Sequence, residues 1–166
     1  MLEMPILKPI PIRTRDVGWI KATWRWITKI RKWELVEEWH YPLPDETEIV
    51  IPPKFVFDGA SIPRPFWAIL SPVGLLLLPG LIHDFGYRYD FLLKRNTQGA
   101  LVRYKEGEGR RFWDRLFREV AIQVNSFRVI NWIAWLALWA FGCFAWSARR
   151  KNPSPIYWLQ AEAPHN

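Results

Sequence analysis

Apolar and polar side chains alternate in short segments over the first third of the chain. The alternation is clear over residues 24–29, and residues 33–37 and 48–51 form two further extended segments. Four prolines between residues 42 and 53 separate these segments. A period of two residues interrupted by such breaks is typical of short antiparallel strands. The pattern therefore predicts a small antiparallel sheet of three or four strands within residues 19–57.

The period of the apolar positions lengthens after Ser61 to that of a helix. We predict helices over residues 63–70, from about Pro79 to Tyr89, and over residues 112–125, with an exposed loop or hairpin at residues 94–111. The last of these helices has one apolar face, formed by Phe112, Trp113, Leu116, Phe117, Val120, Ala121 and Val124. Strands followed by helices indicate an α+β fold. The prediction is a single domain over residues 1–128, with a small N-terminal antiparallel sheet and a helical core.

Residues 129–147 form a hydrophobic segment that we expect to be a C-terminal helix. Its apolar part is about 27 Å long at helical rise, close to the thickness of a bilayer's hydrocarbon core. The basic residues 149–151 that follow favour a transmembrane helix. Two alternatives stay open, because a row of tryptophans suits a helix lying in the membrane interface and a segment this short suits a buried core helix. Residues 148–166 are predicted to be a basic, flexible tail.

The charge balance narrows the choice of partners. The 166-residue chain has a net charge of +7, which favours an anionic partner. It shows no zinc-ligand spacing, no basic region leading into heptads and no RNA-binding strand motif, so we expect a phospholipid or membrane surface and no nucleic acid. Cys143 is a single cysteine, so no disulfide forms within the chain, and the first residues lack the apolar stretch of a signal peptide. The oligomeric state is not predicted.

Three acidic residues and one histidine are the candidates for chemistry. His83 and Asp84 lie in an apolar helix, where both must be paired or solvated, and Tyr87 shares the His83 face. Asp114 lies at the edge of the apolar face of its helix, from which its carboxylate could accept a hydrogen bond from His83. Asp58 lies in a loop with Gly59 and Ser61, where backbone carbonyls could turn toward an ion. Each residue could instead have a structural role: Asp58 as a helix cap or turn, His83 as a satisfied core residue, and Asp114 in an ion pair with Arg111 or Arg118.

The segment 83–88, His-Asp-Phe-Gly-Tyr-Arg, resembles the catalytic helix of the bacterial and fungal phospholipases A2. Residues 58–61, Asp-Gly-Ala-Ser, are similar to part of the calcium loop that precedes that helix. The resemblance implies that His83 is the base that activates water and that Asp114 orients it. It also implies that Asp84 and Asp58 are ligands of Ca²⁺. The chain departs from these enzymes in lacking the cysteines that brace their catalytic helices.

The strands followed by Phe-x-x-Asp-Gly-Ala-Ser-Ile-Pro and His-Asp also resemble a family of short phage and bacterial proteins whose domain has no known function. The first hypothesis is therefore a calcium-dependent, phospholipase A2-like lipid ester hydrolase, encoded by a phage or prophage and associated with the bacterial inner membrane. The alternative is a non-enzymatic phage membrane or virion protein in which the His–Asp cluster is a buried structural network. A cytoplasmic location, and a hydrolase using a transition metal, also remain open.

Overall fold

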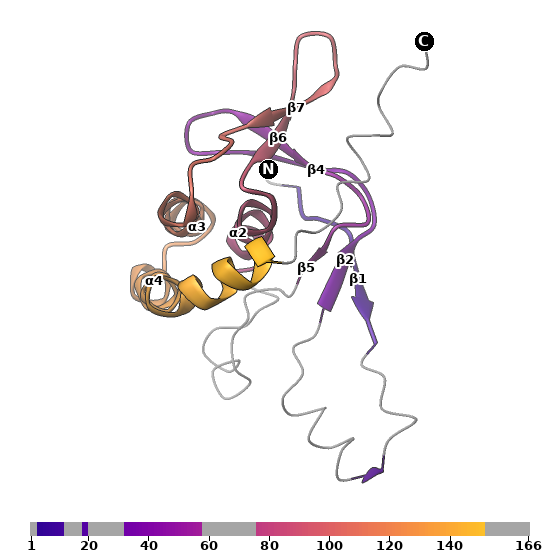
Figure 1. The fold of residues 1–166 in the computed structure, drawn as a ribbon. Coiled ribbons are helices and arrows are strands. Elements are labelled where there is room, and N and C mark those ends of the chain that lie inside the picture. The colour runs from indigo at the N-terminus through magenta and orange to yellow at the C-terminus, as the bar shows by residue number, and fades with distance from the viewer. Residues whose placement is uncertain (1–2, 12–17, 20–31, 58–75, 152–166) are drawn as a thin grey trace.

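The computed structural model describes residues 3–11, 18–19, 32–57 and 76–151, and these residues form an α+β fold (Figure 1). Two antiparallel sheets lie on one side of the central helix, and two further helices lie on its other side. The predicted fold class is thus confirmed. The strand predicted at residues 24–29, the helix predicted at 63–70 and the end of the predicted tail lie outside the described residues.

The first sheet has three strands in the order β1-β2-β5, all antiparallel. Its strands are β1 (Leu7–Ile10), β2 (Lys32–Leu35) and β5 (Val56–Phe57). Leu35 and Phe57 are fully buried, so this sheet contributes one apolar face to the core.

The second sheet has four strands in the order β3-β4-β6-β7, also antiparallel. Its strands are β3 (Trp39–Pro42), β4 (Glu48–Ile51), β6 (Leu92–Arg95) and β7 (Leu101–Tyr104). The hairpin expected within residues 94–111 is thus largely β6 and β7. The second sheet also reaches beyond the N-terminal part of the chain, because β6 follows the central helix and pairs with β4. The return of the chain from the central helix to the sheet is favoured by burial of apolar side chains, since Leu92 and Leu93 of β6 are fully buried.

Helix α2 (Leu77–Tyr89) occupies the centre of the molecule and is buried on nearly every side. Ten of its thirteen residues are buried, which explains why its sequence is apolar all round rather than amphipathic. Pro79 lies in its first turn, where the missing backbone N–H has no partner to lose. The helix ends at Asp90, whose φ of 60° turns the chain into β6.

Helix α3 (Arg110–Val124) is the amphipathic helix predicted from the sequence, and it packs against both α2 and α4. Helix α4 (Arg128–Lys151) reaches further than expected, so residues 148–151 are helical rather than part of a flexible tail. The described helices include none that is long and apolar enough by itself to cross a membrane. Two segments of α4, Arg128–Ala140 and Gly142–Arg150, reach that length and composition only together, and they are bent by 51°. The expected single spanning helix is therefore not supported.

Candidate functional site

The site is built where α2 and α3 face each other. His83 and Tyr87 are one helical turn apart on α2, so both side chains point toward α3 and Asp114. The His83 Nε2 atom lies 3.2 Å from Asp114 Oδ1, and the two side chains are 6% and 2% exposed. The predicted pairing of His83 with Asp114 is thus present, although the residues are 31 positions apart in the chain.

The Asp114 carboxylate accepts two further hydrogen bonds. The Tyr87 hydroxyl donates to Oδ1, the same oxygen that faces His83. The Arg110 guanidinium donates to Oδ2 at 3.1 Å from one turn earlier on α3, and its Nη1 also donates to the Trp139 carbonyl of α4 at 3.1 Å. Arg110 therefore neutralises the buried charge and joins α3 to α4. A carboxylate held by three donors keeps one fixed orientation toward the imidazole.

Tyr87 stays protonated because of its surroundings. Burial raises the pKa of its hydroxyl, and the hydrogen bond to Asp114 and the charge of that carboxylate raise it further. The Tyr87 and His83 rings lie 4.0 Å apart between centroids, and Phe117 of α3 meets the imidazole edge-on at 5.6 Å. Tyr87 is thus a permanent donor to Asp114, and aromatic rings enclose the imidazole on the side of Phe117.

A glycine lets α3 approach α2 closely beside the site. A Cβ added to Gly86 would lie 2.4–2.9 Å from three ring atoms of Trp113, so only glycine fits there. Trp113 is fully buried, and its indole N–H donates to Asp90 Oδ1 at 2.8 Å. The same Asp90 oxygen accepts from the Gly109 N–H at 3.1 Å, next to the first residue of α3. The end of α2 therefore fixes the start of α3, and with it the position of Asp114.

Asp84 points away from Asp114 and toward the end of α4. One of its carboxylate oxygens lies 3.5 Å from Arg149 Nη2, and the same guanidinium donates to the Asp84 carbonyl at 3.2 Å.

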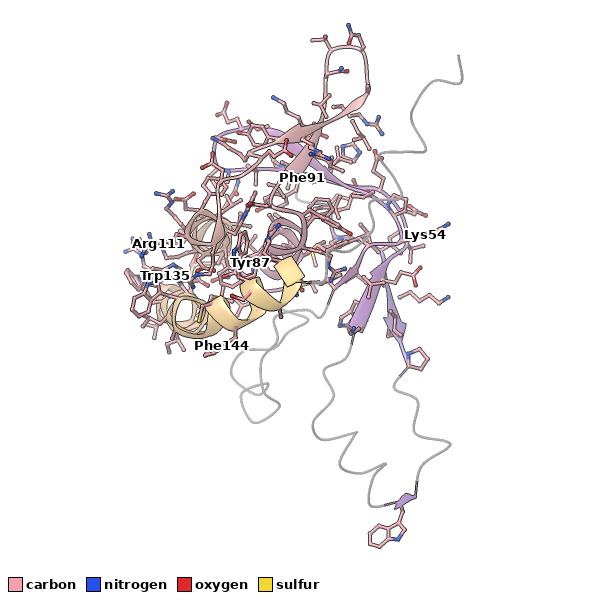
Figure 2. The ribbon with its side chains drawn as sticks, viewed as in Figure 1. Lys54, Tyr87, Phe91, Arg111, Trp135 and Phe144 are labelled. Carbon is pink, nitrogen blue, oxygen red and sulfur yellow. The ribbon has the colours of Figure 1, made fainter. Side chains whose placement is uncertain are left out.

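Arg150, the next residue of α4, donates to the Tyr87 carbonyl at 3.0 Å. Its guanidinium lies over the Trp146 ring, and the centroid of that ring is 5.2 Å from the centroid of the Tyr87 ring. The basic end of α4 is thus attached to α2 (Figure 2). Adjacent helical positions diverge by about 100°, which explains why His83 and Asp84 have different partners.

The predicted metal ligands are only partly described. Asp58, Gly59 and Ser61 lie outside the described residues, and of the predicted Ca²⁺ ligands Asp84 alone is described, beside Arg149. Among residues 3–11, 18–19, 32–57 and 76–151, no group of three His, Cys, Asp or Glu side chains could hold a metal ion. Because the predicted loop lies outside the described residues, the calcium site stays a prediction.

Sequence reasoning missed the arginines of this site. We expected that Asp114, in a purely structural role, would pair with Arg111 or Arg118, but Arg110 is its partner. Arg110 and Asp114 are four residues apart, a spacing that pairs side chains on one helix, but the predicted helix begins at residue 112 and so excludes Arg110. Arg149 and Arg150 belong to the predicted basic, flexible tail, because nothing in a linear sequence brings residues 149 and 150 to positions 84 and 87.

A family model described as a protein of unknown function, DUF1353, matches residues 33–138 of the chain. The chain belongs to the DUF1353 family. The match includes all of the second sheet, α2 and α3, and so it contains His83, Tyr87, Arg110 and Asp114. The Arg149 and Arg150 contacts lie beyond the DUF1353 match. Searches of curated proteins and of solved structures found no match.

Within the described residues, this DUF1353 site engages one of the two ring nitrogens of His83. An ionised carboxylate can only accept hydrogen bonds, so the Nε2 atom that faces Asp114 carries the hydrogen in the neutral imidazole. The Nδ1 atom then holds the lone pair, and no hydrogen bond to it occurs in the described part of the chain. An imidazole oriented in this way can take a proton at Nδ1 while the carboxylate stabilises the resulting imidazolium.

Proposed function

We propose that this protein is a hydrolase of carboxylic esters in lipids, with His83 as the general base and Asp114 as the carboxylate that orients it. The observation that carries the proposal is the buried contact between His83 Nε2 and Asp114, with Asp114 held from its other sides by Tyr87 and Arg110. An orienting carboxylate that is itself fixed is what a general-base histidine requires. The resemblance of residues 83–88 to the phospholipases A2 implies the same roles for His83 and Asp114.

The proposed reaction needs no covalent enzyme intermediate. The His83 Nδ1 atom takes a proton from a water molecule as the water oxygen attacks the ester carbonyl carbon. The tetrahedral intermediate then collapses, the bond to the alcohol oxygen breaks, and the imidazolium returns the proton to that oxygen. The products are a free carboxylic acid and an alcohol. Asp114 stabilises the imidazolium throughout, and Tyr87 and Arg110 keep the carboxylate in place.

Calcium is a separable part of the proposal. A Ca²⁺ ion would stabilise the oxyanion that forms on the carbonyl oxygen, and Asp84 and Asp58 are its predicted ligands. Because Arg149 is paired with Asp84, a metal ligated by that carboxylate would have to displace the guanidinium. Arg149→Ala should therefore increase the apparent affinity for Ca²⁺ if Asp84 is a ligand, and leave it unchanged if Asp84 has only a structural role.

A second candidate is a non-enzymatic membrane or virion component in which the same residues form a structural network. The observation that favours it is the burial of the cluster, since Asp114 is 2% exposed and bonded to three internal donors. Buried polar networks of this kind can fix the register of packed helices. The two candidates predict different effects of removing the imidazole.

The test is release of fatty acid from phospholipid vesicles by the full chain, with and without added Ca²⁺, for wild type and His83→Ala. His40→Ala is the matched control, because His40 is a surface histidine on β3 whose ring contacts Glu48 at 2.6 Å and Glu38 at 2.8 Å. General-base catalysis contributes about 10²- to 10⁴-fold to the rate. The rate of fatty acid release should therefore fall by about 10²- to 10⁴-fold in His83→Ala and stay unchanged in His40→Ala.

Thermal unfolding of the same variants completes the test. A catalytic His83 predicts that His83→Ala loses activity at temperatures where circular dichroism shows the protein still folded. Absence of ester hydrolysis from wild type across neutral, anionic and zwitterionic lipids, together with a marked fall in the His83→Ala melting temperature, would replace the enzyme proposal with the structural one.

A further inference from the structure

One side of α4 exposes a stripe of large apolar side chains. The stripe repeats at spacings of three and four residues and consists of Val129, Trp132, Ile133, Leu136 and Trp139. Val129 is 72% exposed and the other four are about half exposed. The opposite side of the helix packs against α3, with Asn131 fully buried and Ala134 nearly so. A contiguous apolar stripe on a protein surface usually marks an interaction site.

A row of arginines on α3 borders this stripe. Arg111 and Arg115 are exposed and one turn apart, and Arg118 follows within another turn. The Arg118 guanidinium lies over two α4 rings, 4.9 Å from the centroid of Trp132 and 5.1 Å from that of Trp135. Arg111 and Trp135 lie at the same edge of the molecule (Figure 2). Arg118 therefore joins the arginine row to the apolar stripe at Trp132.

We infer that this surface docks on the headgroup region of an anionic phospholipid membrane, with α4 lying along the membrane rather than crossing it. The charge is complementary, because α3 carries four arginines against two acidic residues, of which Asp114 is buried, and α4 has no acidic residue. Guanidinium groups bind lipid phosphates bidentately, while tryptophan suits the boundary between hydrocarbon and water. A helix with one apolar stripe and basic neighbours is typical of interfacial binding.

The contacts that α4 makes with α2 and α3 favour an interfacial position over a spanning one. A spanning helix would expose its whole circumference to hydrocarbon, including the side that carries Asn131 and the Trp139 carbonyl bonded to Arg110. It would also have to release Arg149 and Arg150 from α2. An interfacial position keeps all of these contacts and buries Val129, Trp132, Ile133, Leu136 and Trp139.

The inference deepens the proposed function by naming the surface at which the hydrolase would meet its lipid. The two can nevertheless fail separately, because binding is measured without turnover and His83→Ala should bind as wild type does. Catalytically inactive protein that still binds would leave the docking surface standing alone.

The experiment is co-sedimentation of the full chain with vesicles of phosphatidylcholine alone and of phosphatidylcholine mixed with phosphatidylglycerol. Arg115→Glu tests the arginine row, and Lys54→Glu is its matched control, because it makes the same change of charge on the opposite side of the molecule (Figure 2). Ile133→Asp tests the stripe, and Val36→Asp is its control, since Ile133 and Val36 are 51% and 45% exposed.

We expect wild type to bind the anionic vesicles more tightly than the zwitterionic ones, with binding that weakens as salt is added. Arg115→Glu should weaken binding by roughly fivefold or more, and Ile133→Asp should weaken it by a similar factor. The two controls should bind as wild type does. Equal weakening by Lys54→Glu would overturn the inference by showing that net charge alone drives binding.

Two other results would also overturn it. Absence of vesicle binding combined with salt-dependent binding to duplex DNA or RNA would assign the arginines to nucleic acid. Reversible dimerisation in sedimentation equilibrium that Ile133→Asp abolishes would assign the stripe to a second copy of this chain.

Discussion

The hydroxyl of Tyr87 offers the sharpest test of how the site is held together. Tyr87→Phe removes one donor to the Asp114 carboxylate and keeps the aromatic ring that packs against His83 and Trp146. Since Phe matches the ring in shape, the change in the free energy of unfolding reports mainly the lost hydrogen bond. Tyr41→Phe is the matched control, because Tyr41 is also fully buried but donates to the neutral Gln123 amide at 3.1 Å.

The expected difference follows from the charge of the acceptor. A hydrogen bond to a charged group contributes about 1.5–3 kcal/mol, and one between neutral groups about 0.5–1.5 kcal/mol. Tyr87→Phe should therefore lower the free energy of unfolding by about 1.5–3 kcal/mol, because water has little access to a carboxylate that is 2% exposed. Tyr41→Phe should lower it by about 0.5–1.5 kcal/mol.

The measurement is urea unfolding of wild type and both variants at neutral pH, followed by tryptophan fluorescence and circular dichroism. Equal m-values would show that the variants differ in stability rather than in the extent of unfolding. For a chain of this size, the loss should correspond to a fall in melting temperature of about 2–4 °C per kcal/mol. If the protein is the proposed hydrolase, Tyr87→Phe should also lower kcat while KM changes less, because the orientation of Asp114 acts on the chemical step.

The refuting result is a Tyr41→Phe variant that loses as much stability as Tyr87→Phe, or more. It would mean that the charge of the Asp114 carboxylate does not strengthen its hydrogen bond with Tyr87. The argument that Tyr87 stabilises a buried charge would then be wrong, although the contact between His83 and Asp114 would stand.

Two further predictions concern the approach of α3 to α2 and the acid stability of the second sheet. Gly86→Ala should destabilise the protein by about 1–3 kcal/mol despite the better helix propensity of alanine, because its methyl group would overlap the Trp113 ring. Gly18→Ala, where nothing lies within 4 Å, is the control for thermal unfolding, and equal melting temperatures would contradict the close packing. The Tyr104 hydroxyl lowers the pKa of Asp45 below its usual 3.8, helped by the Thr47 hydrogen bonds and the charge of Lys105. This stability is complete above the unfolded pKa and is lost as pH falls through the lower folded value, so Tyr104→Phe should unfold with a shallower dependence on pH below about pH 4. Unchanged pH dependence in acid unfolding curves would contradict that assignment.

Local periodicity was sufficient to predict the helices around the site. The apolar run before Tyr89 and the amphipathic face at residues 112–125 both became helices within two residues of the predicted starts and ends. Helical periodicity is a property of neighbouring residues, so it can be read without the fold. The same geometry placed Tyr87 on the face of His83. The chemistry of a buried histidine then required a partner, and Asp114 was a correct choice.

The sheets were harder to predict, because strand pairing joins residues far apart in the chain. Residues 48–51 were correctly predicted as a strand, but their pairing with β6 depends on the chain returning after α2. Local alternation cannot specify which strands pair when several apolar segments are available. The position of β6 beside β4 was therefore decided by packing against α2, where Leu92 and Leu93 are buried.

By itself the sequence determined the fold class and the helix that carries His83 and Asp84, and it made Asp114 a candidate partner of His83. Only the tertiary structure decided that Arg110 balances the Asp114 charge, that Arg149 pairs with Asp84, and that α4 packs against α3 and is bent by 51°. The physical reason is the range of the interactions. Helix periodicity acts over a few residues, whereas a long arginine side chain takes whichever acceptor the packing of distant helices brings within its reach.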